Sequence, residues 1–139
     1  MDNKALITKA IETMQNSYSP YSEFKVGAAL LTTDGKIYTG CNIENASYSM
    51  TVCAERTAIF KAVSDNKRSF KKIAIIAGKD GVVTSYTSPC GACLQVMTEF
   101  CDADFEVILA KSIDDYKVYK LTQLLPHSFS SENLGANYD

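Results

Sequence analysis

The order of the hydrophobic patterns restricts the fold of this chain more than any other feature. Two β-like runs, residues 24–32 and 36–43, are joined through Asp34-Gly35, which is a strong hairpin signal. Helical and strand-like patterns then alternate: helices are expected over residues 52–64 and after "SPCGAC" to about Phe100, and strands over 71–78 and 105–110. A hairpin followed by this alternation favours an α/β fold in which helices cover a mixed sheet.

Shorter elements are expected at the two ends of the chain. Residues 3–16 read as an amphipathic helix, because apolar side chains recur at helical spacing from Leu6 to Met14. "LTQLLP" suggests a short helix that Pro126 ends. No internal repeat, low-complexity segment or linker divides the 139 residues, so we expect one domain, residues 1–139.

Charge and hydropathy weigh against two kinds of partner. The net charge is −2 and no basic run is present, so nucleic-acid binding gains no electrostatic support and a small neutral ligand fits better. The sequence contains neither a signal peptide nor an apolar stretch long enough for a membrane helix. Five cysteines without an export signal point to the reducing cytoplasm, where a cysteine cluster is more often metal-binding or catalytic than disulfide-bonded.

Three cysteines form the candidate metal group. Cys90 and Cys93, in "SPCGACLQV", lie at positions i and i+3 of a helical pattern, and Pro89 suits the first helical turn. A Cys-x-x-Cys motif alone is ambiguous between zinc, a redox pair and structural thiols. Cys53 also stands where a loop enters a helix, and this third cysteine favours zinc. Three protein ligands leave the fourth tetrahedral position open to water.

Glu55 and Arg56 follow Cys53 closely in "TVCAERTAIF". Positions i and i+2 do not share a helical face, so Cys53 and Glu55 can meet only over the N-terminal end of the helix. Zinc with three thiolates and a hydroxide carries a net charge of about −2, which the positive ends of two helices and Arg56 can offset. We therefore expect Cys53 to bind the metal, Glu55 to transfer protons and Arg56 to compensate thiolate charge.

Cys-Ala-Glu followed by Pro-Cys-x-x-Cys resembles the zinc-dependent nucleoside deaminases. "YSPYSEFKVGAALLT", "GCNIENASYSMTVCAERTAI", "SPCGACLQVMTEF" and "LLPHSF" extend the resemblance to the small, homotetrameric cytidine deaminases, over nearly the whole chain. The resemblance implies a three-layer α/β fold with a central mixed five-stranded sheet flanked by helices. It also implies one zinc ion per subunit and a homotetramer whose sites are shared between subunits.

The reaction that the resemblance implies is hydrolytic deamination of cytidine and 2′-deoxycytidine to the uridine forms, with release of ammonia, in pyrimidine salvage. A zinc-bound hydroxide would attack the ring carbon that bears the exocyclic amine. Glu55 would accept the proton of the water, deliver it to the adjacent ring nitrogen and later help to protonate the leaving amine.

Substrate-binding residues are also implied by the resemblance. Asn42 and Glu44 match a pair that hydrogen-bonds a ribose 3′-hydroxyl, and Phe24 matches an aromatic side chain that packs on the base. Phe129 matches a C-terminal aromatic residue that enters the site of a neighbouring subunit. The chain departs from many relatives at Leu94, where they have arginine directly after the last zinc cysteine.

Five further positions fall in segments that contact substrate in the family. Two lie in a substrate loop, and backbone groups around the other three would meet the edge of the base. These positions are Ala46 and Tyr48, and then Ala54, Ser88 and Pro89.

Several alternatives are open at this point. A deaminase for a modified nucleoside such as blasticidin S would use the same scaffold, whereas a zinc-stabilised RNA-binding module or a thiol oxidoreductase would be a different class. The cysteines could also be buried structural thiols, or a closed zinc site with His127, Cys41 or Cys101 as fourth ligand, but Glu55 would then lack a purpose. Otherwise we expect Cys41 and Cys101 to be core residues and His127 to lie on the surface.

Overall fold

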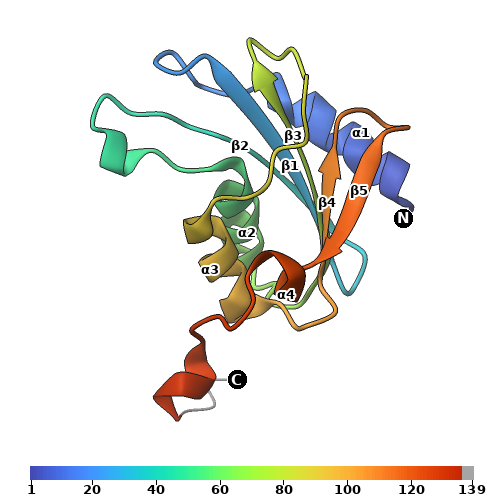
Figure 1. Cartoon of the computed structure of the whole chain (residues 1–139), viewed down its shortest axis with the longest axis vertical. Coiled ribbons are helices and arrows are strands. Elements are labelled where there is room, and N and C mark those ends of the chain that lie inside the picture. Colours follow the sequence, from blue (N-terminus) through green and yellow to red (C-terminus); the bar gives the residue numbers. More distant parts are fainter. Residues whose placement is uncertain (136–139) are drawn as a thin grey trace.

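A single mixed sheet runs through the centre of the molecule, in a computed structural model that describes residues 1–135 (Figure 1). The strand order is β2-β1-β3-β4-β5; β3 and β4 are parallel and the other neighbouring pairs are antiparallel. The strands are β1 (Phe24–Thr32), β2 (Ile37–Cys41), β3 (Phe70–Lys79), β4 (Glu106–Ala110) and β5 (Tyr116–Lys120). The expected mixed five-stranded sheet is therefore confirmed.

Helices cover both faces of this sheet, which gives the three expected layers. Helix α1 packs on one face, and α2 and α3 pack on the other together with the short α4 (Figure 1). The helices are α1 (Asn3–Met14), α2 (Ala54–Ser64), α3 (Gly91–Phe100) and α4 (Leu121–Leu124), and 3₁₀ turns span Tyr48–Met50 and Ser131–Leu134. None of the helices within residues 1–135 has the length and apolarity of a membrane span.

The helix boundaries differ from the predicted ones in ways that matter for the site. Helix α1 ends at Met14 rather than at residue 16. Helix α2 begins at Ala54, with Cys53 as its N-cap. Helix α3 begins at Gly91 and its N-cap residue is Cys90. The expectation that Pro89 lies in the first helical turn was therefore wrong, because Pro89 precedes the N-cap. Each of these two cysteines thus stands at the first position outside a helix.

The structure contains one strand, β5, that the hydrophobic pattern did not predict. Its sequence, "YKVYK", alternates, but all five of its side chains are partly or fully exposed. β5 is an edge strand, and lysines on such a strand discourage pairing with another chain. Because of these lysines, β5 lacks the continuous apolar run that identifies β3 and β4 as strands in the sequence.

Gly40 allows α2 to lie directly on the sheet. A Cβ atom at this position of β2 would lie 2.4 Å from the Ala54 carbonyl oxygen and 2.6 Å from the Ala58 nitrogen, both in the backbone of α2. Because these are main-chain atoms, no side-chain rotation relieves the clash. The absence of a side chain at Gly40 therefore sets the short distance between the sheet and α2, whose first turn carries Glu55 and Arg56.

Replacing Gly40 with alanine is expected to lower the free energy of unfolding by about 1–3 kcal/mol, as for other overpacked cores. Urea titration followed by circular dichroism measures this change. Gly91→Ala is the matched control, since no atom lies within 4 Å of the added Cβ. An unchanged urea midpoint for Gly40→Ala would show that α2 can shift without loss.

Candidate metal centre and active site

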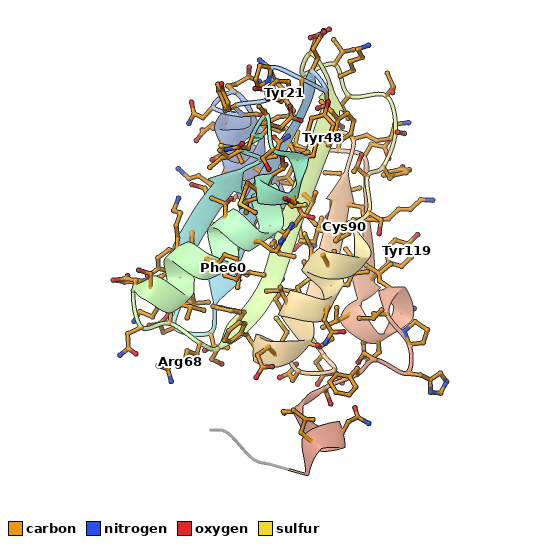
Figure 2. All side chains as sticks on the ribbon, turned by 90° about the vertical axis from the view of Figure 1, so that its left-hand side faces the viewer. Tyr21, Tyr48, Phe60, Arg68, Cys90 and Tyr119 are labelled. Atoms are coloured by element: carbon orange, nitrogen blue, oxygen red, sulfur yellow. The ribbon has the colours of Figure 1, made fainter. Side chains whose placement is uncertain are left out.

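The beginnings of α2 and α3 bring three sulfur atoms together. Cys53 and Cys90 are the N-caps of these helices, and Cys93 lies buried in the first turn of α3. Neither N-cap thiol bonds to the backbone of its own helix, so both sulfurs are free for another partner. The Sγ atoms of Cys53 and Cys90 are 3.8 Å apart, and those of Cys90 and Cys93 are 3.5 Å apart. Figure 2 shows Cys90 at the start of its helix.

This donor set fits a zinc ion. The three ligand atoms all lie within 4.8 Å of one another, and a tetrahedral zinc with bonds of about 2.3 Å separates its sulfurs by roughly 3.8 Å. Among residues 1–135, no fourth histidine, cysteine, aspartate or glutamate belongs to the group. Cys41 and Cys101 stand outside it and His127 is exposed, so the described residues do not form the closed four-ligand site considered above.

Arg56 places a positive charge beside the cysteine group. Its Nη2 donates to the Cys53 sulfur at 3.5 Å, from one turn further along α2. A hydrogen bond from Cys93, with further contributions from Arg56 and Cys90, lowers the pKa of Cys53 to about 5. The sulfur is therefore held as a thiolate, the form that binds metal.

Exchange of Arg56 for glutamine should weaken zinc binding by about 10- to 100-fold, because a donor that supports a ligand thiolate is lost. Competition with a chromogenic chelator measures the affinity. Arg68→Gln is the control: Arg68 is exposed, and Figure 2 shows it well away from Cys90. Equal zinc affinities for the two variants would argue against charge compensation by Arg56.

Glu55 is the buried acid of the site. It lies in the first turn of α2 and is only 4% exposed. Burial is the main cause that raises the pKa of Glu55, to about 7, and the Cys53 thiolate adds to the effect, whereas Cys93 and Arg56 oppose it. A carboxyl group that titrates near neutral pH is suited to both accept and return a proton.

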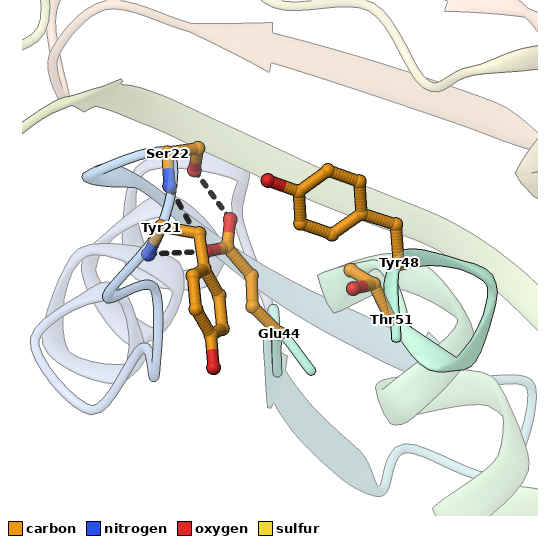
Figure 3. A pocket seen from close by; sticks show the side chains of 5 residues that line it. All are labelled: Tyr21, Ser22, Glu44, Tyr48 and Thr51. Carbon is orange, nitrogen blue, oxygen red and sulfur yellow. Dashed lines mark hydrogen bonds between the residues drawn. The ribbon is translucent and has the colours of Figure 1, made fainter. Parts of the chain in front are cut away.

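Glu55, Cys53 and Cys90 open into a cavity of about 290 Å³. Its wall comes from the strands β1 and β3, the segment after β2 and the connection that leads into α3. The lining residues are Ser22, Phe24, Val26, Asn42, Glu44, Thr51, Cys53, Glu55, Ile75, Thr87, Ser88 and Cys90. An adjoining cavity of about 390 Å³ shares Ser22, Glu44 and Thr51 with it and adds Tyr21 and Tyr48 (Figure 3).

Most of the hydrogen-bonding positions of the Asn42 side chain are occupied by other groups of the chain. Its Oδ1 accepts hydrogen bonds from the Val26 amide at 2.9 Å and from the Ser17 hydroxyl, while its Nδ2 donates to the Phe24 carbonyl at 2.7 Å. An amide side chain has two acceptor positions and two N–H donors. One N–H of Asn42 therefore stays available to a ligand.

Glu44 lines both cavities and is fixed by the loop before β1. Its Oε1 accepts from the amides of Tyr21 at 3.0 Å and Ser22 at 3.1 Å, and its Oε2 accepts from the Ser22 hydroxyl (Figure 3). The hydroxyl of Ser22 is the largest cause that lowers the pKa of Glu44. Three donors thus hold an ionised carboxylate, and one acceptor position on Oε2 is left.

The remaining predicted residues are distributed unevenly around the two cavities. Phe24 and Ser88 line the main cavity and Tyr48 lines the adjoining one. Three others line neither cavity: Pro89 and Ala54 are buried beside the N-cap cysteines, and Ala46 is exposed.

Phe129 is likewise absent from the cavity of its own chain. Its side chain is 59% exposed, and its carbonyl accepts a hydrogen bond from Gln95 Nε2 at 2.7 Å, on α3. The described residues therefore place this aromatic ring on the outside of the molecule.

Sequence reasoning did not single out several residues of the cavity wall. Of these, Ser22 lies in the turn before β1, and Glu23, which separates it from Phe24, has a φ of 61°, so no strand periodicity marks Ser22 in the sequence. Thr87 adjoins the predicted Ser88 but carries no pattern of its own. The other three are Val26, Thr51 and Ile75.

A three-sulfur zinc group at two helix N-termini, with a buried glutamate beside it on a mixed α/β sheet, defines a zinc-dependent deaminase. Residues 1–109 match the family model for the cytidine and deoxycytidylate deaminase zinc-binding region, and the chain belongs to this family.

Relatives match over nearly the full length. The chain is 52% identical to a cytidine deaminase of Sporosarcina psychrophila over 96% of both proteins. It is 48% identical to a probable cytidine deaminase of Dictyostelium discoideum, over 95% of this chain and 89% of that protein. The crystal structure of a cytidine deaminase from Burkholderia pseudomallei superposes with a TM-score of 0.86 at 44% identity, over 93% of this chain and all of that one.

Proposed function

We propose that this chain hydrolyses the amino group of cytidine and 2′-deoxycytidine, giving uridine and 2′-deoxyuridine with release of ammonia, in pyrimidine salvage. The observation that carries the proposal is the buried Glu55 in one cavity with the cysteine group. The names of the relatives and the family of the chain support the same reaction. Family membership favours this function over the RNA-binding module and the thiol oxidoreductase that the sequence left open.

The chemistry divides between the metal and the chain. Cys53, Cys90 and Cys93 would hold the zinc ion, which, when bound, would act as a Lewis acid and lower the pKa of water towards neutrality. A carboxylate oxygen of Glu55 takes up the proton of the attacking water and passes it to the ring nitrogen next to the reacting carbon. Glu55 then takes up the second proton of that water and gives it to the amine, which leaves as ammonia while the ring carbon keeps the oxygen. The near-neutral pKa of Glu55 suits both directions of transfer.

The free nucleoside fits the cavity better than its 5′-phosphate. No lysine or arginine belongs to the lining of either cavity among residues 1–135, whereas the carboxylate of Glu44 belongs to both. Proteins usually bind phosphate through Arg, Lys or free helix N-termini. The N-termini of α2 and α3 already face the cysteine group. We therefore expect cytidine to be strongly preferred to deoxycytidylate.

Asn42 and Glu44 are equipped to bind a single hydroxyl group. The free N–H of Asn42 can donate to this hydroxyl, and the free acceptor position of Glu44 can take its proton. A 3′-hydroxyl is present in both ribose and 2′-deoxyribose. One such contact explains the expected use of both nucleosides.

Removal of the Ser22 hydroxyl, by Ser22→Ala, should raise the KM for cytidine and 2′-deoxycytidine by about tenfold, since a hydrogen bond to a charged group is worth about 1.5–3 kcal/mol. The KM for 2′,3′-dideoxycytidine should change little, because this substrate has no hydroxyl for Glu44 to accept. Ser22→Thr keeps the hydroxyl and serves as the control. A similar change for all three substrates would mean that Ser22 does not act through Glu44.

The direct test of the proposed function is loss of the ultraviolet absorbance of cytidine, with and without a zinc chelator. We expect chelator-sensitive turnover of cytidine and 2′-deoxycytidine and little turnover of deoxycytidylate. Blasticidin S in the same assay tests the alternative of a modified-nucleoside deaminase. Faster turnover of that compound than of cytidine would replace the proposed substrate.

We also infer a homotetramer with shared sites. The exposed aromatic side chains of Tyr21 and Tyr48, which line the adjoining cavity, support an interface there, and the exposed ring of Phe129 is free to enter a neighbour. Light scattering tests the assembly. Mixing Phe129→Ala with Glu55→Gln chains should restore part of the activity, and no restoration would count against shared sites. A cytoplasmic location and a single domain over residues 1–139 stay predictions.

A further inference from the structure

One wall of the main cavity has few attachments to the rest of the molecule. Thr87 and Ser88 lie in this wall, on the connection between β3 and α3. At its ends, Val83 packs against the core and Pro89 is buried. Between them, residues 84–88 take part in no backbone–backbone hydrogen bond within the described chain. A segment with so few contacts needs another attachment to keep one shape.

Tyr86 supplies this attachment. Its hydroxyl donates to the Asp115 carboxylate, in the connection between β4 and β5. The ammonium groups of Lys111 and Lys117 lie 5.3 and 4.7 Å from the centre of its ring, and the ring packs against the core under α2 and α3. The only other side-chain hydrogen bond from residues 84–88 ends on Pro89, at the end of the same connection. Tyr86 is therefore the one polar link from this segment to another part of the described chain.

We propose that Tyr86 is a positioning residue for the substrate, which holds Thr87 and Ser88 in the cavity wall by anchoring residues 84–88 to the β4–β5 connection. The inference rests on the proposed function, because it takes this cavity as the nucleoside site. Tyr86 itself does not line the cavity. It acts by keeping the wall in its binding-competent form.

A positioning role for Tyr86 predicts that its loss weakens substrate binding but has little effect on the chemical step. If the anchor is lost, the competent wall becomes a minor conformation, and the apparent dissociation constant rises by the reciprocal of its population. Glu55, Cys53 and Cys90 are held by α2 and α3 and not by Tyr86. Turnover of bound substrate should therefore change much less than binding.

The test compares Tyr86→Ala with wild type in zinc-loaded protein. We expect the KM for cytidine to rise about tenfold while kcat stays within about threefold, as for a competent population reduced to about one tenth. The dissociation constant of uridine, measured by calorimetry without turnover, should rise by the same factor. Tyr86→Phe keeps the ring and its contacts with both lysines, and should restore both constants to within about threefold of wild type.

Tyr38→Ala is the matched control. Tyr38 packs against the same core, its hydroxyl also donates to an aspartate, Asp65, and it does not line the cavity. This variant should lose thermal stability but keep the KM and the uridine affinity of wild type. An equal rise of both constants in Tyr38→Ala, or no rise in Tyr86→Ala, would overturn the proposal.

A second variant keeps the test decisive if Tyr86→Ala does not fold. Lys111→Gln/Asp115→Asn/Lys117→Gln changes only the partly or fully exposed partners of Tyr86. It should raise the KM at least threefold, as for a competent population reduced to about one third or less. Wild-type binding constants in this variant would contradict the anchor. Wild-type protein that neither turns over cytidine nor binds uridine would remove the proposed function and the anchor together.

Discussion

Glu55→Gln is expected to lower kcat for cytidine by about 10²- to 10⁴-fold, the usual contribution of a positioned general acid and base. Glutamine has nearly the shape of glutamate but cannot accept the proton. The zinc content should stay near one per chain, because Glu55 does not belong to the cysteine group. Kinetics in the ultraviolet assay and metal analysis of the same sample measure both effects.

Glu99→Gln is the matched control for this substitution. Glu99 is an exposed glutamate of α3, and its variant should keep both zinc and turnover. Retention of most turnover by Glu55→Gln would refute the proton-transfer role. Loss of zinc together with turnover would instead make Glu55 part of the metal site.

The metal-free protein gives an independent view of Glu55. Burial raises its pKa from the ordinary value to about 7, so ionisation opposes folding. The stability of wild type relative to Glu55→Gln should therefore fall as the pH rises from about 4.5 to 7, because only wild type carries this carboxyl group and the other titrating groups are shared. Denaturant titrations of the two metal-free proteins across this range provide the measurement. Parallel stability profiles would mean that the carboxyl group is not desolvated.

Cys90→Ala is expected to abolish zinc retention and to reduce turnover below about 1% of wild type, since two thiolates do not complete a catalytic zinc site. Metal analysis after dialysis and the cytidine assay follow the two losses. The melting temperature should also fall, because zinc bound to the folded state no longer adds to stability.

Cys101→Ala controls for the loss of a thiol as such. Cys101 is a half-buried cysteine outside the metal group, and its variant should keep zinc near one per chain. A full zinc content in Cys90→Ala would remove this residue from the ligand set.

The sequence predicted the central part of the site because local rules governed it. Cys53, Glu55 and Cys90 stand at helix starts, and helical geometry alone limits where such side chains can meet. The mixed sheet followed from the hairpin and the alternation after it. β5 could not be recognised, because a charged edge strand lacks the apolar run that marks a buried one.

Most of the features of the site that the sequence did not predict depend on contacts between segments that are distant in the sequence. Ser22 bonds Glu44 across 22 positions, Ser17 bonds Asn42 across 25, and Tyr86 meets Asp115 across 29. No spacing rule connects residues so far apart. They become neighbours only once the sheet has formed.

The three ligand sulfurs come from the starts of two different helices, and this determines when during synthesis and folding the chain can bind its metal ion. Strand β3 separates α2 from α3 in the sequence, so Cys53 and Cys90 can meet only after both helices have docked on the sheet. A nascent chain that has left the ribosome only as far as α2 offers one of the three ligand thiolates. Tight capture of the ion therefore requires that α3 has been made and has docked beside α2, and copies that end before Cys90 should stay empty.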